Sequence, residues 1–145
     1  AGQIIESYFR QYPAVKSWTE QVIAEAKAAG YVETLCGRRR YLRDITSSNA
    51  AVRSGAERMA MNAPIQGAAA DLIKIAMVKV DTALRQSKLR TKMLLQVHDE
   101  LLFEVPESEI EQATGLIVDG MKNALTLKVP LVVETGVGKT WLEAH

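Results

Sequence analysis

Cysteine and histidine are scarce in this chain of 145 residues, which contains one cysteine and two histidines. Cys36 therefore has no partner for an internal disulfide bond. One cysteine and two histidines are also too few for a structural zinc site, which takes four such ligands. So little cysteine is typical of proteins in a reducing cytosol, and we expect a cytoplasmic protein.

Long apolar runs and an excess of one charge are also missing. No stretch has the length and apolar character of a membrane span, and we expect neither a signal peptide nor a membrane partner. The formal net charge is +1, so any preference for nucleic acid must come from local patches. With 48% hydrophobic and 24% charged residues, the chain has the composition of a globular domain with a core.

The chain begins with Ala-Gly-Gln rather than methionine and passes directly into a helical pattern, as expected for a piece of a longer protein. Apolar residues at helical spacing predict helix over residues 2–29, and Pro13 fits the first turn of a second helical segment. Gly30 is expected to end that segment as a C-terminal cap. We expect this region to serve packing rather than chemistry.

A small β-hairpin is predicted next, with strands at 31–35 and 40–42 on either side of Cys36-Gly37. A group of arginines lies on this hairpin: Arg38, Arg39, Arg40 and Arg43. Guanidinium groups match phosphate oxygens, so the arginines could contact a nucleic-acid backbone. Alternatively, they form a solvated hairpin edge whose charge protects it from aggregation.

Residues 52–86 show a long helical pattern. An apolar stripe is expected to face the core and consists of Leu72, Ile73, Ala76, Met77, Val80 and Leu84. In the first half, Arg58, Asn62 and Gln66 are spaced by four and share one helix face. They could donate hydrogen bonds to acceptors in the DNA minor groove, which every base pair presents, or simply face solvent. Pro64 is expected to kink or break the helix, and the small residues 67–70 allow another backbone to approach.

Two apolar runs, 93–97 and 101–105, flank His98, Asp99 and Glu100 and predict a β-hairpin. Because both runs are apolar almost throughout, we expect both faces of the hairpin to be buried. A carboxylate pair at the tip of a buried hairpin is costly unless it binds a metal ion or a basic partner. The alternative is an ordinary polar turn.

Downstream of this hairpin, Pro106 begins another predicted helix, residues 129–135 a final apolar strand, and Trp141 is expected to pack the tail. These elements predict an α+β fold with a mainly antiparallel sheet. Gly136-Val-Gly-Lys-Thr140 is similar to the end of a phosphate-binding loop. Such a loop needs a glycine five positions before Gly138, and that position is Val133 here, so we reject the interpretation.

Three sequence blocks, in order, resemble one family. Gln96-Val-His-Asp-Glu100 is similar to the third carboxylate motif of family A DNA polymerases, the bacterial DNA polymerase I type. The block 57–67, continuing to Ala70-Asp71, resembles the palm helix that precedes that motif. Residues 30–35 and 37–39 match a third block, and 133–136 and 141–145 resemble the family's C-terminus. The resemblance covers nearly the whole chain.

This resemblance implies part of a right-hand polymerase fold, with a mainly antiparallel palm sheet packed against long helices. Residues 1–50 would be the C-terminal part of the fingers and 51–145 the palm. Asp99 would be a ligand of the catalytic Mg²⁺ ions, Glu100 an accessory carboxylate at the metal site, and His98 a neighbour of the primer terminus. The row Arg58, Asn62 and Gln66 matches residues that touch primer–template DNA in the minor groove.

The implied activity is that of a DNA-directed DNA polymerase, a nucleotidyltransferase that adds deoxynucleotides to a primer 3′ end by two-metal catalysis. Its partners would be primer–template DNA and deoxynucleoside triphosphates, and its location the cytoplasm at the nucleoid. The family's other carboxylate motif, its nucleotide-binding fingers helix and its thumb are not found in this sequence. We therefore expect a partly supplied Mg²⁺ site and no activity from this chain alone, and self-association of the chain stays open.

Two other functions remain as alternatives. The chain could be a non-catalytic DNA-binding module derived from such a polymerase, although an intact His98-Asp99-Glu100 argues against degeneration. A metal-dependent phosphohydrolase using the His-Asp pair would need several more ligands. The only other histidine is His145 at the terminus, which makes that function a poor fit.

Overall fold

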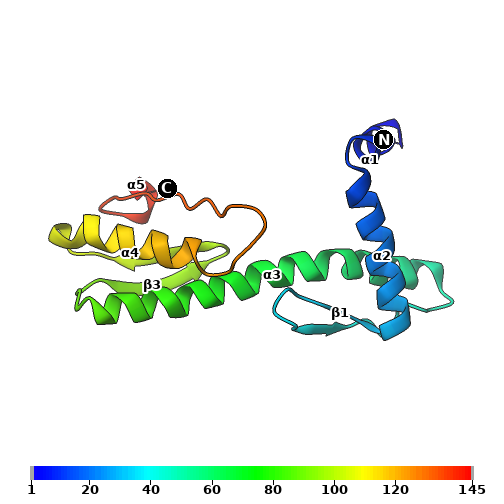
Figure 1. Ribbon diagram of the computed structural model, residues 1–145, viewed down its shortest axis with the longest axis horizontal. Helices are drawn as coiled ribbons and strands as arrows, with labels where there is room; N and C mark the ends of the chain where they lie inside the picture. The colour runs from blue at the N-terminus through cyan, green and yellow to red at the C-terminus, as the bar shows by residue number, and fades with distance from the viewer. Residues whose placement is uncertain (1, 145) are drawn as a thin grey trace. The chain divides into compact units, whose positions relative to one another are not determined.

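The computed structural model describes residues 2–144 and is rich in helix (Figure 1). The helical elements are α1 (Gly2–Gln11), α2 (Pro13–Ala29), α3 (Ala50–Gln86), the 3-10 turn η1 (Glu107–Glu109), α4 (Ile110–Lys122) and α5 (Trp141–Ala144). The strands are β1 (Tyr31–Glu33), β2 (Arg39–Tyr41), β3 (Lys92–Val97) and β4 (Glu100–Glu104). β1 pairs with β2 and β3 with β4, both antiparallel. The predicted α+β class with antiparallel pairing is confirmed.

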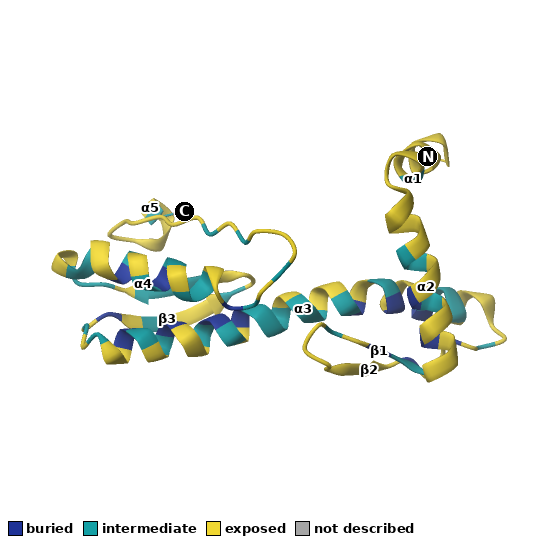
Figure 2. Ribbon diagram, viewed as in Figure 1, coloured by how far each residue is buried: buried dark blue, intermediate teal, exposed yellow. Residues whose placement is uncertain are grey.

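The chain divides into two compact units between Ala68 and Ala69. In the first unit, α2, the β1–β2 hairpin and the first part of α3 share one core. Buried alanines line one side of α3 and let α2 approach closely, and this core consists of Val22, Ala26, Val32, Leu42, Ile45, Ala56, Ala60 and Ala63. Lys27 of α2 also pairs with Glu57 of α3 at 2.7 Å. By contrast, α1 is exposed along most of its length (Figure 2).

The predicted helix boundaries in this unit are confirmed. Pro13 starts α2, and Gly30 caps it in the left-handed conformation (φ 79°), where its N–H bonds the carbonyl of Ala26. Of the kink or break predicted at Pro64 in the long helix, the break is wrong, because α3 continues through Pro64 from Ala50 to Gln86.

The second unit packs the β3–β4 hairpin against α4 and the last turns of α3. One buried cluster in this unit consists of Val80, Leu84, Ala113 and Ile117, and the partly buried Met93, Phe103 and Val105 of the hairpin region pack against it. The apolar stripe predicted on α3 is confirmed, since Ile73, Ala76, Val80 and Leu84 are buried.

The prediction that both faces of the β3–β4 hairpin are buried is wrong. Met93 and Phe103 pair across the strands and face the helices, whereas Leu95 pairs with Leu102 on the other face. Leu95 is 45% exposed, and Leu94, a bulge between two register positions, is 51% exposed. Apolar residues on both faces need a layer on each side, and the described residues supply helices on one side only.

The predicted final strand is also wrong. Residues 129–135, all within the described part of the chain, adopt an irregular conformation, and Val132 is 80% exposed. A strand requires a partner for its backbone hydrogen bonds, so apolar β-branched composition alone does not create one. Trp141 starts the short α5 and is half-exposed rather than packed into a core.

Candidate functional site

His98 and Asp99 form the two-residue turn of the β3–β4 hairpin, since Val97 pairs with Glu100. His98 has a φ of 54°, in the left-handed region that side chains other than glycine rarely adopt. Two-residue hairpins often place glycine at that position. The side-chain amide of Gln96 donates a 2.7 Å hydrogen bond to the His98 carbonyl and so braces the turn. A strained non-glycine residue held this way is typical of a functional site.

His98, Asp99 and Glu100 are all exposed, so the expectation of a buried carboxylate pair is wrong. Glu100 begins β4 and, by strand alternation, lies on the uncovered face with Leu102. Because no burial opposes their charge, these carboxylates are accessible to a cation or a basic partner. The predicted hairpin tip is confirmed, with His98 and Asp99 in the turn and Glu100 at the start of β4.

The turn supplies only part of a metal site. Among residues 2–144, no group of three or more His, Cys, Asp or Glu side chains is placed to hold a metal ion. Mg²⁺ binds carboxylate oxygens and keeps its other positions for water and phosphate oxygens. Asp99, with Glu100 beside it, fits the role of one protein ligand of such an ion.

The second candidate group is the row Arg58, Asn62 and Gln66. All three are exposed on α3, within the first unit, as the spacing predicts. Each step of four residues turns the helix by about 40° beyond a full turn, so the row stays on one side. The buried Ala56, Ala60 and Ala63 turn away from it into the core. The Arg58 guanidinium donates to the Ser54 hydroxyl at 3.2 Å, which orients it along the helix.

The part of α3 that carries Asn62 and Gln66 has low intrinsic helix propensity. Pro64 lacks the N–H that an interior helical residue donates, and Gly67 lies three residues later. In a helix interior, proline costs about 3 kcal/mol and glycine about 1 kcal/mol relative to alanine. Asn62 and Gln66 flank Pro64, so this part of the row needs support from outside the helix.

That support comes from the β1–β2 hairpin. The Arg38 guanidinium donates a 3.0 Å hydrogen bond from Nη2 to the carbonyl of Gly67. A Cβ on residue 67 would lie 2.4 Å from Cγ2 of Thr34, so only glycine permits this contact. Sequence reasoning noted the small residues after Gln66 but missed Arg38 as their partner.

The other arginines of this hairpin have separate contacts. Arg39 donates to the Glu33 carboxylate at 2.6 Å and stacks over the Tyr31 ring at 4.5 Å. The hydrogen bond to Glu33 raises the pKa of Arg39 above its usual value. Arg40 contacts the sulfur of Met59 at 3.4 Å. Phosphate binding by these arginines stays a prediction.

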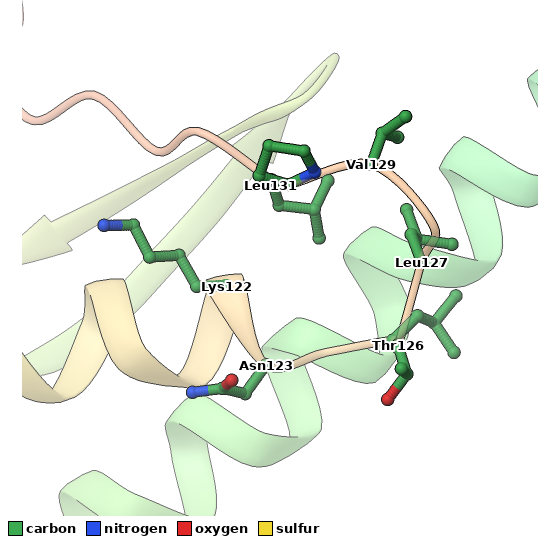
Figure 3. A pocket seen from close by; sticks show the side chains of 8 residues that line it. Lys122, Asn123, Thr126, Leu127, Val129 and Leu131 are labelled. Atoms are coloured by element: carbon green, nitrogen blue, oxygen red, sulfur yellow. The ribbon is translucent and has the colours of Figure 1, made fainter.

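A pocket of about 330 Å³ lies where α4 ends and the following loop turns back (Figure 3). Its lining is mixed and consists of Lys122 and Asn123 at the helix end, followed by Leu125, Thr126, Leu127, Val129, Pro130 and Leu131. It contains none of the predicted site residues, so the candidate functions rest on the hairpin turn and the α3 row.

The sequence profile of DNA polymerase family A matches residues 1–143. The chain belongs to this family. DNA polymerase I of Bacillus caldotenax is 52% identical over 144 residues, which make up 99% of this chain and 16% of that polymerase. The thermostable DNA polymerase I of Thermus filiformis is 54% identical over 99% of this chain and 17% of its own length. The family resemblance drawn from the motifs is therefore confirmed.

A solved family A structure has the same fold as this chain. The POL domain of Pol1 from M. smegmatis, in complex with DNA primer-template and dNTP, matches with a TM-score of 0.94 at 49% sequence identity. The match covers 97% of this chain and 25% of that one. The chain thus spans a small share of the length of its relatives. Within residues 2–144, no helix is both long and apolar enough to cross a membrane.

Proposed function

We propose that this family A chain forms the C-terminal fingers and palm portion of a DNA-directed DNA polymerase. The observation that carries the proposal is the exposed, strained His98-Asp99 turn in a chain whose family and fold are those of DNA polymerase I. Residues 1–50 would belong to the fingers and 51–145 to the palm. The reaction is template-directed addition of deoxynucleotides to a primer 3′ end, in the cytoplasm at the nucleoid.

In this proposal, Asp99 is a ligand of catalytic Mg²⁺, with Glu100 as an accessory carboxylate and His98 beside the primer terminus. When bound, two such ions activate the attacking hydroxyl and stabilise the leaving oxygen of a phosphoryl transfer. The exposure of all three side chains supports this assignment, because substrate oxygens and water can reach them.

The proposed partners are primer–template DNA and deoxynucleoside triphosphates, which the related Pol1 domain holds in its solved complex. Arg58, Asn62 and Gln66 would donate hydrogen bonds to minor-groove acceptors, which occupy similar positions in every base pair.

We also propose that the isolated chain self-associates through the uncovered hairpin face around Leu94 and Leu95. Light scattering would then show a mass that rises with concentration, and a constant monomer mass would contradict it.

The catalytic assignment is tested in a chimera, in which this chain replaces the matched segment of the M. smegmatis Pol1 domain. Asp99→Ala should reduce single-turnover primer extension at least a hundredfold, about 2.7 kcal/mol, because a metal ligand is lost. Primer–template affinity, measured by fluorescence anisotropy, should stay unchanged.

The matched control is Glu104→Ala, which removes a carboxylate of the same hairpin whose partner is Lys92 at 3.3 Å. It should leave extension within about twofold. If the Asp99→Ala chimera kept activity within about tenfold of the unmodified chimera, or 1.4 kcal/mol, Asp99 would not be a metal ligand.

The incomplete ligand set among the described residues favours a second function for the isolated chain, that of a DNA-binding module without catalysis. A chimera that folds and binds primer–template but extends no primer would support this alternative.

A further inference from the structure

The tip of the β1–β2 hairpin meets α3 directly beside Gln66. The hydrogen bond from Arg38 ends on the carbonyl of Gly67, the residue after Gln66, and the Thr34 methyl group fills the space that a side chain at 67 would occupy. Both contacts reach the turn of α3 that contains Pro64. The hairpin therefore braces the part of the donor row that helical propensity supports least.

The hairpin tip itself is well ordered by local hydrogen bonds. The Thr34 hydroxyl accepts from the backbone N–H groups of Cys36 at 3.3 Å and Arg38 at 3.2 Å. The Thr34 N–H donates to the Arg38 carbonyl at 3.0 Å, and the Gly37 N–H donates to the Thr34 carbonyl at 2.9 Å. Arg38 thus projects from a closed turn, which lets its side chain hold the helix at a defined distance.

We propose that Arg38 is a positioning residue for DNA binding, which fixes the α3 turn carrying Gln66 through the Gly67 carbonyl. This inference rests on the proposed function of the Arg58, Asn62 and Gln66 row. A donor that is already in place loses less freedom on binding, so bracing increases affinity without a contact between Arg38 and DNA. We expect the bracing to affect Gln66 more than Arg58, because Arg58 lies more than two helical turns before Gly67.

The test measures primer–template affinity of the chimera described above by fluorescence anisotropy. Arg38→Met keeps the apolar stem but removes every donor, and it should weaken binding about tenfold. Arg38→Lys retains a charged donor and should recover affinity to within about threefold of wild type. Arg85→Met is the control, because it removes the same charge from an exposed arginine of α3 whose partner is Asp81 at 2.8 Å. It should change affinity by less than about twofold.

Double variants separate positioning from general loss of structure or charge. In a Gln66→Ala background, Arg38→Met should add less than a twofold effect, whereas in an Arg58→Ala background the two effects should multiply. The salt dependence of affinity should be the same for Arg38→Met and Arg85→Met, because neither residue contacts phosphate in this proposal. Should Arg38→Met fail to fold by circular dichroism, Arg38→Leu takes its place with the same expectations, because leucine also has no donor.

Two kinds of failure are distinguishable. If Gln66→Ala weakens binding but Arg38→Met does not, or if their effects multiply, the positioning role is wrong and the proposed row stands. If wild type does not bind primer–template, or if Arg58→Ala and Gln66→Ala leave affinity unchanged, the proposed row is wrong and the positioning role falls with it.

Discussion

Glu109 shows how one side chain can join distant parts of the second unit. Its carboxylate lies just before α4 and accepts hydrogen bonds from the backbone N–H groups of Arg90 and Thr91 and from the Thr91 hydroxyl, all at 2.9–3.1 Å. Its burial raises the pKa of the Glu109 carboxyl. These hydrogen bonds, together with one from the Arg90 side chain, lower the pKa by a larger amount, so the net pKa falls below the usual value. The carboxylate therefore ties the start of β3 to the start of α4.

The loss of stability on replacing Glu109 should depend on pH. A lowered folded-state pKa stabilises the protein above the ordinary glutamate value of 4.5, and this stabilisation disappears as the pH falls through the folded-state pKa. Glu109→Gln should thus lower the melting temperature by roughly a few degrees at pH 7, and by less at pH 3. Thermal unfolding by circular dichroism at both pH values measures this.

The control for that experiment is Glu20→Gln, which removes an exposed ion pair with Lys16 at 4.0 Å. Such surface ion pairs contribute little to stability, so the melting temperature of the Glu20→Gln variant should match that of wild type at both pH values. Equal losses for Glu109→Gln at pH 7 and pH 3 would show that the carboxylate charge is not what stabilises the contact.

Arg58 is the charged member of the proposed DNA-binding row on α3. Arg58→Ala should weaken primer–template binding about fivefold to tenfold, since one charge-assisted hydrogen bond is lost. The loss should be similar for templates of different base sequence, because minor-groove acceptors are shared by all base pairs. Affinity measured on several primer–templates tests this.

Arg85→Ala offers a comparison on the same helix, because Arg85 is exposed and paired with Asp81 at 2.8 Å. It should leave affinity nearly unchanged. A loss for Arg58→Ala that differed strongly between base sequences would contradict a shape-sensing role.

At the scale of elements, α3 illustrates how tertiary contacts override local preference. Pro64 predicts a break, yet the helix continues, because buried alanines on one side and the hairpin contact at Gly67 hold it in place. Conversely, residues 129–135 have the composition of a strand, but they pair with none of the strands in the described part of the chain. Propensity decided neither outcome.

Adding a methyl group at position 67 should show whether helix propensity or packing has the larger effect on stability there. Gly67→Ala favours the helix by about 1 kcal/mol, but its Cβ would lie 2.4 Å from Cγ2 of Thr34. We expect a net destabilisation of about 1–2 kcal/mol, because overpacking exceeds the gain in propensity. Urea unfolding at equilibrium measures it.

Thr34→Ser provides the matched rescue, since serine keeps the hydroxyl that orders the hairpin tip but lacks Cγ2. The double variant Gly67→Ala/Thr34→Ser should recover most of the lost stability, because the next nearest atom, the Thr34 Cβ, would be 3.7 Å away. If the double variant were no more stable than Gly67→Ala, the clash with the Thr34 methyl would not be the cause.

At the scale of the whole molecule, the described residues supply only part of the proposed metal site. The described residues place Asp99 and Glu100 at one turn but no cluster of three ligands. The chain corresponds to 16% of the B. caldotenax polymerase, in which the matched region is one part of a longer protein.

We therefore expect the 145-residue chain alone to extend no primer in the presence of Mg²⁺ and all four deoxynucleoside triphosphates. Gel analysis of a labelled primer measures this, and the active chimera serves as the positive control in the same assay. Templated extension by the chain alone would mean that its own carboxylates suffice for catalysis.

The sequence by itself determined the features that depend on local spacing or on motif order. Helices α1 to α4, both hairpins, the row on α3, the turn with His98 and Asp99, and the family all follow from residues close together in the chain. Only the tertiary structure decided which face of the β3–β4 hairpin is covered, that residues 129–135 form no strand, and that Arg38 braces Gly67. The physical reason is that burial, strand pairing and long side-chain contacts depend on partners far away in sequence, which local patterns do not specify.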